Sequence, residues 1–99
     1  AGQIALHPET MELEMTDIPQ ETTRVMSNLK EVLKEAGMDF SHVVKTSIFL
    51  SNMDLFASVN EVYASYFDSD SPFPARETVA VAGLPKGVNV EISVVAYKG

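Results

Sequence analysis

Two segments of the chain carry apolar residues at the spacing of amphipathic helices. The first lies between Asp17, a typical N-cap residue, and Gly37, which suits a C-terminal cap. Its apolar stripe consists of Val25, Leu29, Val32, Leu33 and Ala36. The second segment follows Asn52 and Asp54, either of which can cap it, and runs to about Phe67. The pattern predicts two helices that each bury one face.

Strand-like segments alternate with these helices. The β-branched run at residues 42–50 predicts a strand, and residues 1–6 predict a shorter one. Residues 71–97 are interpreted as two more strands, joined by a turn at residues 84–87 where proline and glycine favour a bend. This order predicts an α+β sandwich, one sheet with both helices on one face. The other face, carrying Val95 and Tyr97, is a candidate subunit interface.

Pairing the last two strands about that turn predicts a hairpin with a defined register. Ala80 then lies opposite Glu91, and Arg76 lies opposite Val95. Because side chains alternate across a strand, one hairpin face collects valine and isoleucine and packs against the helices. The opposite hairpin face carries Arg76, Thr78 and Glu91. A shift of one residue would exchange the two faces.

Composition narrows the class of protein. With 99 residues we expect one domain, residues 1–99. The formal net charge of −7 argues against a nucleic-acid binder, which needs a basic surface. No apolar run is long enough to cross a bilayer, and no secretory signal is visible, so we expect no membrane partner and a location in the cytoplasm or an organelle.

Metal and thiol chemistry find no support in the sequence. The absence of cysteine excludes disulfides, a thiol nucleophile and Cys-based zinc sites. Neither His7 nor His42 stands at a metal-ligand spacing, and both border turns, which favours capping or surface roles. We therefore expect no metal.

The remaining candidate chemistry is Arg76 with Glu91. A guanidinium offers a planar fork to a carboxylate, and a partly shielded carboxylate can act as acid or base or position a water. Such a pair could bind a small organic acid and hydrate or protonate its far end. Spacing alone favours the alternative, a structural salt bridge of Arg76 with Glu91 or with a neighbouring subunit. For Asn60, beside the apolar stripe of the second helix, spacing favours a structural amide satisfied by a loop backbone.

Several of these segments resemble one known family. AGQIAL, EAGMDFSHVVKTSIFL, DLFASVNEVYASYF and above all FPARETVAVAGLPKGVNVEISVVAY are similar to the Rid family, the reactive intermediate deaminases also called YjgF, from Ala1 to Tyr97. The resemblance implies a chorismate-mutase-like fold and a homotrimer. In that trimer the sheet face without helices would point inward, and the ligand sites would lie between subunits. It implies hydrolysis of enamine or imine intermediates, such as 2-aminoacrylate, to 2-keto acids and ammonia without a cofactor.

The resemblance also implies roles for individual residues. Arg76 looks like the arginine that binds the substrate carboxylate, and Glu91 like the glutamate that positions or activates water. Asn60 resembles a family asparagine of the site region. Three more positions resemble ligand-facing ones: Gly2 and Thr78, through backbone groups, and Phe73, in a proline-flanked wall. Family members carry an N-terminal strand and a tyrosine before GQI, and we expect that segment to be missing here.

Two other functions remain open beside the deaminase. The same cleft could bind keto acids and report metabolic state through protein contacts, without turnover. Ribonuclease activity, attributed to some family members, is a weaker alternative because the chain is acidic and no histidine lies near Arg76 in sequence. We expect a cofactor-independent deaminase of small carboxylate-bearing imines, with the keto-acid-binding module as the alternative.

Overall fold

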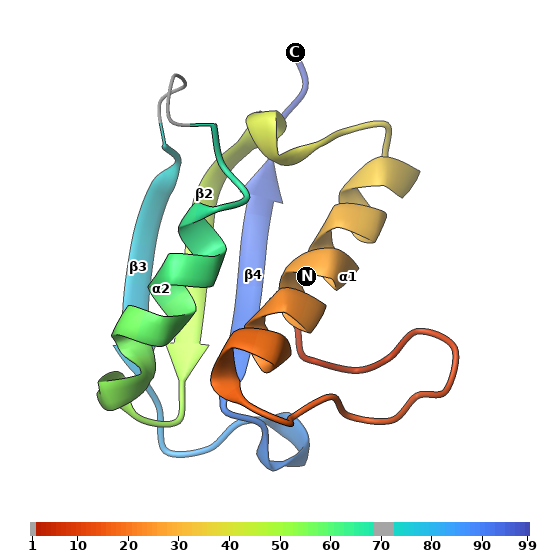
Figure 1. Ribbon diagram of the computed structural model, residues 1–99. Coiled ribbons are helices and arrows are strands. Elements are labelled where there is room, and N and C mark those ends of the chain that lie inside the picture. Colours follow the sequence, from red (N-terminus) through yellow and green to blue (C-terminus); the bar gives the residue numbers. More distant parts are fainter. Residues whose placement is uncertain (1, 69–72) are drawn as a thin grey trace.

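One mixed four-stranded sheet is covered on one face by two helices, as the sequence predicts (Figure 1). The computed structural model describes residues 2–68 and 73–99. Its strands and helices, in chain order, are β1 (Gly2–Gln3), α1 (Ile18–Glu35), β2 (Val43–Leu50), α2 (Phe56–Ala64), β3 (Ala75–Ala80) and β4 (Val90–Ala96). Short 3₁₀ turns lie at Phe40–His42, Met53–Leu55 and Pro85–Gly87. The strand order is β1-β4-β2-β3.

Helix α1 begins and ends where its cap residues predict. The Asp17 carboxylate accepts a hydrogen bond from the Gln20 N–H at 2.8 Å. At the other end Gly37 adopts a φ of +74°, and the Met38 N–H donates to the Leu33 carbonyl. The buried face agrees with most of the predicted stripe, but Val32, one of its members, is 44% exposed.

The predicted hairpin between the last two strands is wrong. Strand β2 lies between them, parallel to β3 and antiparallel to β4. The predicted turn does form, with φ of +68° at Gly87, but it belongs to a connection that passes from one side of β2 to the other. The Val81 N–H donates to the Leu50 carbonyl and the Ser51 N–H to the Asn89 carbonyl, which ties both ends of that connection to the end of β2.

The sheet therefore has a different distribution of side chains from the one the hairpin predicts. We call the side covered by α1 and α2 the helix face and the other side the open face. Ile48, opposite Ile92 of β4, is 1% exposed on the helix face, and Ile92 is fully buried there. Ile48 also lies opposite Thr78 of β3, so Thr78 belongs to the helix face too. The valines of β4 are placed as predicted, but Val79 of β3 is 44% exposed, because the two faces of β3 are exchanged.

Two polar side chains of α1 hold other elements in place. The Asn28 amide donates to the Ile4 and Leu6 carbonyls at 3.0 and 2.8 Å, which fixes the segment after β1. The fully buried Glu21 carboxylate accepts from the Asn89 and Val90 N–H groups at 2.8 and 3.1 Å. Both contacts satisfy backbone groups that no strand pairing serves at these points, so α1 positions both β1 and the start of β4.

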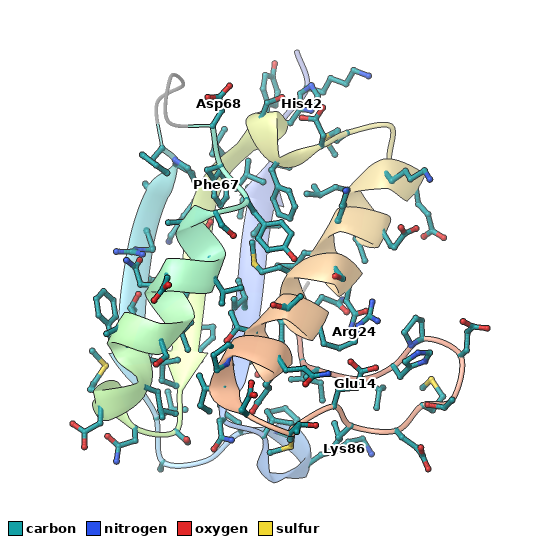
Figure 2. The ribbon with its side chains drawn as sticks, in the orientation of Figure 1. Glu14, Arg24, His42, Phe67, Asp68 and Lys86 are labelled. Atoms are coloured by element: carbon teal, nitrogen blue, oxygen red, sulfur yellow. The ribbon has the colours of Figure 1, made fainter. Side chains whose placement is uncertain are left out.

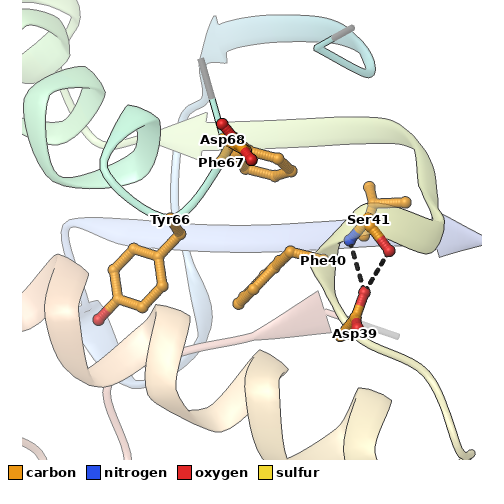
Figure 3. Close-up of a pocket in the computed structure, with 7 residues that line it drawn as sticks. Asp39, Phe40, Ser41, Tyr66, Phe67 and Asp68 are labelled. Atoms are coloured by element: carbon orange, nitrogen blue, oxygen red, sulfur yellow. Dashed lines mark hydrogen bonds between the residues drawn. The ribbon is translucent and has the colours of Figure 1, made fainter. Parts of the chain in front are cut away.

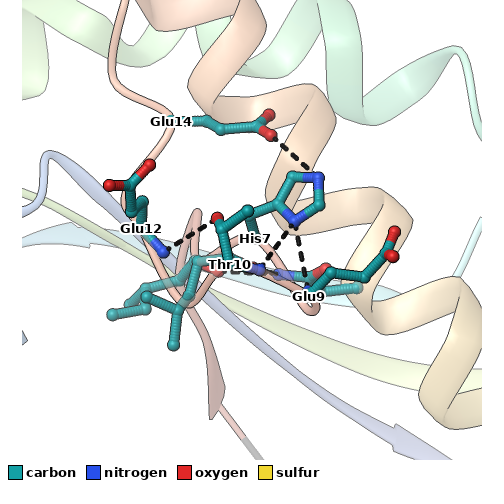
Figure 4. Close-up of polar contacts among 8 residues, drawn as sticks. His7, Glu9, Thr10, Glu12 and Glu14 are labelled. Atoms are coloured by element: carbon teal, nitrogen blue, oxygen red, sulfur yellow. Dashed lines mark hydrogen bonds and ion pairs between the residues drawn. The ribbon is translucent and has the colours of Figure 1, made fainter.

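Both histidines are capping residues, as their sequence context predicts. His7 Nδ1 accepts from the Glu9 and Thr10 N–H groups at 3.1 and 3.3 Å, and its Nε2 lies 3.8 Å from Glu14 (Figure 4). His42 Nδ1 accepts from the Asp39 N–H at 3.1 Å. Within residues 2–68 and 73–99, no cluster of three or more histidine, aspartate or glutamate side chains could hold a metal ion.

The open face is exposed in the single chain, as predicted. Val95 is 56% exposed and Tyr97 is 70% exposed. Neither helix of the described chain has the length and apolar character needed to span a membrane.

Candidate functional site

Arg76 extends from the edge strand β3 toward helix α2. It lies opposite Thr46 of β2, whose buried side chain points to the helix face. Three residues of α2 at the spacing i, i+4, i+7 meet it there. The Asn60 amide oxygen accepts a hydrogen bond from Arg76 Nη1, and the guanidinium carbon lies 5.4 Å from the ring centroids of both Phe56 and Tyr63.

Tyr63 connects this cluster to the core. It is 3% exposed, and its hydroxyl donates to the Thr46 hydroxyl at 3.0 Å. Burial raises the pKa of the Tyr63 hydroxyl above its usual value, while the Thr46 hydrogen bond and the Arg76 charge act in the opposite direction. The phenol therefore stays protonated at neutral pH and keeps its donor.

A hollow of about 470 Å³ opens beside the guanidinium. Its lining residues are Asn60, Tyr63, Ala64, Phe73, Pro74 and Arg76. Phe73 is 55% exposed, and its ring centroid lies 6.1 Å from that of Phe67. Among the described residues Arg76 makes no ion pair, and its side chain is exposed to solvent. A positive charge without a counterion beside a hollow is suited to binding an anion.

Thr78 lies two residues along β3 from Arg76, on the same face. Its hydroxyl oxygen is buried and has no hydrogen-bond partner within the described chain. Strand β3 and the short strand that contains Gly2 are the two edges of the sheet. Edge strands leave backbone N–H and C=O groups without a strand partner, and the backbone role of Gly2 and Thr78 stays a prediction.

Glu91 lies on the other side of the sheet from Arg76. It is opposite Phe49 of β2, three positions from Thr46, and an odd separation along a strand places side chains on opposite faces. Its carboxylate lies directly over Gly2: a Cβ atom at Gly2 would stand 2.2 Å from Glu91 Oε2. Only a glycine permits this approach without displacement of the carboxylate.

The predicted site residues thus fall into two groups. Arg76, Asn60 and Phe73 gather around the hollow on the helix face, which we call the arginine half, and Thr78 lies on the same face. Gly2 and Glu91 meet on the open face, which we call the glutamate half. The prediction that Arg76 and Glu91 share one face is wrong, and so is a salt bridge between them within one chain. The structural role predicted for Asn60 on a loop backbone is also wrong, because its partner is Arg76.

Sequence reasoning did not assign Phe56 and Tyr63 to the site. In the sequence both are simply apolar positions of the second helix, and their helical spacing with Asn60 is the available signal. That spacing indicates a contact with Arg76 only if β3 lies beside α2, which the sequence does not show.

A second hollow, of about 550 Å³, lies between the 3₁₀ turn Phe40–His42 and the segment after α2 that contains Phe67 and Asp68 (Figures 2 and 3). Aromatic rings form much of its wall, and the rings of Phe40 and Phe67 meet edge to face. Hydrogen bonds from the Ser41 hydroxyl and N–H lower the pKa of the Asp39 carboxyl at its rim. None of the predicted site residues lines this hollow.

Known proteins match the chain over nearly its whole length. The family model described as "Endoribonuclease L-PSP" matches residues 1–98. A human protein named 2-iminobutanoate/2-iminopropanoate deaminase is 42% identical over 99 residues, which cover 100% of this chain and 71% of the human protein. The structure of YyfA from Yersinia pestis, of the conserved Rid protein family, has a TM-score of 0.92 at 45% identity, covering 97% of this chain and 75% of that one. That of E. coli TdcF with bound serine has a TM-score of 0.92 at 33% identity, covering 100% and 78%.

Proposed function

This chain belongs to the Rid family, whose family model is described as endoribonuclease L-PSP, and we propose that it hydrolyses 2-imino acids to 2-keto acids and ammonia. The observation that carries the proposal is the exposed Arg76 guanidinium, which has no counterion among the described residues and borders a hollow of about 470 Å³. Human, mouse and rat relatives named for this reaction support it.

Arg76 binds the carboxylate of the substrate. Within the described part of the chain only one of its N–H groups is engaged, by Asn60, so the remaining donors can form the paired hydrogen bonds that a guanidinium makes with a carboxylate. The serine bound in the TdcF structure has a carboxylate of the same kind. The aromatic and proline residues of the wall suit a short apolar substituent at C3 of the imino acid.

Glu91 positions the attacking water, and it does so from another copy of the chain. Within one chain it lies across the sheet from Arg76, so one substrate cannot reach both side chains. We propose that the arginine half of one subunit faces the glutamate half of its neighbour in a homotrimer. The exposed Val95 and Tyr97 supply apolar area for such contacts.

The reaction needs only water and proton transfers. Water held by Glu91 adds to C2 of the imine, with its proton passing by way of the carboxylate to nitrogen. In the resulting carbinolamine the hydroxyl proton passes to the amino group, a C=O bond forms at C2 as the C2–N bond breaks, and ammonia leaves the 2-keto acid. An enamine such as 2-aminoacrylate first gains a proton at C3 and loses one from nitrogen, which gives its tautomer 2-iminopropanoate. Imines hydrolyse in water without a catalyst, so the protein has to lower the activation free energy by only a few kcal/mol. Each reduction of about 1.36 kcal/mol raises the rate about tenfold.

Ribonuclease activity has less support from the same geometry. Neither histidine lines the hollow beside Arg76, and both use Nδ1 to accept backbone hydrogen bonds. The net charge of −7 also disfavours a polyanion. RNA cleavage that persists in highly purified protein and disappears in Arg76→Ala would favour this function instead.

The test measures ammonia release from 2-iminobutanoate and 2-aminoacrylate, which a second enzyme generates in the assay mixture. We expect acceleration by the wild-type protein, loss of it in Arg76→Ala, and no loss in Arg24→Ala, which removes the only other arginine. Equal rates for Arg76→Ala and wild type would exclude the proposed role of Arg76. Keto-acid binding that depends on Arg76 without any acceleration of hydrolysis would identify a binding module instead.

A further inference from the structure

The partners of Arg76 within the described chain are all electrically neutral. They are the Asn60 amide and the rings of Phe56 and Tyr63, and all three belong to α2. Arginines at protein surfaces commonly pair with carboxylates, and this chain has 14 acidic residues and only seven basic ones. The three salt bridges of the described residues do not include Arg76. In an acidic chain, this arginine is thus surrounded by groups that orient it without cancelling its charge.

The helix geometry explains how the three residues hold one group. Residues seven apart on a helix are separated by about 10.5 Å along its axis. The guanidinium carbon nevertheless lies 5.4 Å from each ring centroid and over both rings, so it contacts Phe56 and Tyr63 together. Asn60 comes from the turn between them and accepts from one edge of the guanidinium. The hydrogen bond from Tyr63 to the buried Thr46 fixes one of the rings in turn.

We infer that Phe56, Asn60 and Tyr63 are positioning residues that hold the Arg76 guanidinium in one orientation while leaving its charge free for a substrate carboxylate. The two rings restrict its faces, and the amide occupies one of its donors. The remaining donors are directed to the ligand. Because the guanidinium is already oriented, it loses little further conformational entropy when the ligand binds. This inference rests on the proposed function for the identity of the ligand, but it concerns the state of Arg76 before the ligand arrives.

The sharpest variant is Asn60→Asp, which keeps the size and the accepting oxygen but adds a negative charge. An aspartate there would pair with Arg76 and compete with the ligand. We expect the dissociation constant for 2-ketobutyrate, measured by calorimetry, to rise about tenfold or more. KM for the imine should rise in the same proportion, with kcat less affected, and the thermal midpoint should not fall.

The rings are tested by comparing conservative and non-conservative changes. Tyr63→Phe keeps the ring but removes the hydroxyl that bonds Thr46, so its KM should rise less than that of Tyr63→Leu. Tyr63→Leu and Phe56→Leu each remove a ring, and each should raise KM several-fold. Tyr66→Leu is the matched control, since it removes a ring just after α2 whose described ring partner is Phe40. Phe56 is only partly buried, so its variant remains informative if the Tyr63→Leu protein does not fold.

The outcomes separate this inference from the proposed function. Wild-type affinity for 2-ketobutyrate in Asn60→Asp would overturn the inference, whether or not the protein is a deaminase. So would an equal KM for Tyr63→Phe and Tyr63→Leu, or no binding by the wild type. Weaker binding by Asn60→Asp with no imine hydrolysis by the wild type would support the inference and refute the proposed function.

Discussion

Arg76 and Glu91 lie on opposite faces of one sheet. Arg76 is opposite Thr46 of β2, and Glu91 is opposite Phe49, three residues further along that strand. Arg76 meets α2 on the helix face, and the Glu91 carboxylate covers Gly2 on the open face. A sheet is a continuous barrier of backbone, so one small molecule cannot contact both side chains of one chain. A site that uses both residues must therefore be assembled from two subunits.

The planar shape of the Arg76 guanidinium should contribute to substrate binding as well as its charge. Arg76→Lys keeps the positive charge but replaces a planar group with a single ammonium, and it loses the paired hydrogen bonds to a carboxylate. We expect KM for 2-iminobutanoate to rise about tenfold. Steady-state ammonia release measures this, with Arg24→Lys as the matched control. An unchanged KM in Arg76→Lys would show that charge alone suffices.

Gly2→Ala should impair catalysis more than stability. The new Cβ would stand 2.2 Å from Glu91 Oε2, and the carboxylate, at the end of a flexible side chain, would rotate away. We expect kcat to fall by about tenfold or more, because Glu91 no longer holds the water. Gly83→Ala is the control, since a Cβ there meets nothing within 4 Å. Equal kcat values for the two variants would contradict the role of the Gly2–Glu91 contact.

Glu21 should be important for stability and not for the site. Its buried carboxylate accepts from the Asn89 and Val90 N–H groups, and Val90 is fully buried. Glu21→Ala would leave these donors unpaired, which lowers the free energy of unfolding by about 2 kcal/mol or more. Urea unfolding measures the change, with the exposed Glu35→Ala as control. Equal stability of the two variants would show that water replaces the carboxylate.

Tyr63 should add to the loss of stability at alkaline pH. Burial raises the pKa of its hydroxyl in the folded state, so its contribution is fully present below the unfolded pKa of about 10 and is lost as the pH rises through the higher folded pKa. The difference in unfolding free energy between wild type and Tyr63→Phe should therefore shrink above pH 10. A difference that is constant from pH 8 to 11 would contradict this assignment.

The element order could be read from the sequence because local signals agreed with the fold. Asp17 and Gly37 set the ends of α1 through contacts within a few residues. The alternation of Val90 and Ile92 identified the buried side of β4. The resemblance to the Rid family indicates Arg76 and Glu91 as site residues, which is still a prediction; periodicity alone favours a salt bridge between them.

The pairing of strands could not be read in the same way. The residues at 84–87 favour a turn, and a turn between two strand-like segments suggests a hairpin. Whether β2 inserts between the two strands depends on contacts of β2 with both neighbours, which are distant in sequence. That insertion reverses the faces of β3, moves Arg76 next to Phe56 and Tyr63, and separates it from Glu91.

The intersubunit site is tested most directly by mixing two inactive variants. Arg76→Ala retains the glutamate half and Glu91→Gln retains the arginine half. In trimers assembled at random from equal amounts of both after unfolding and refolding together, about a quarter of the sites between neighbouring subunits would join two intact halves. We therefore expect ammonia release to recover to about a quarter of the wild-type rate. Activity no higher than that of either variant alone, in trimers shown to be mixed, would contradict a site shared between subunits.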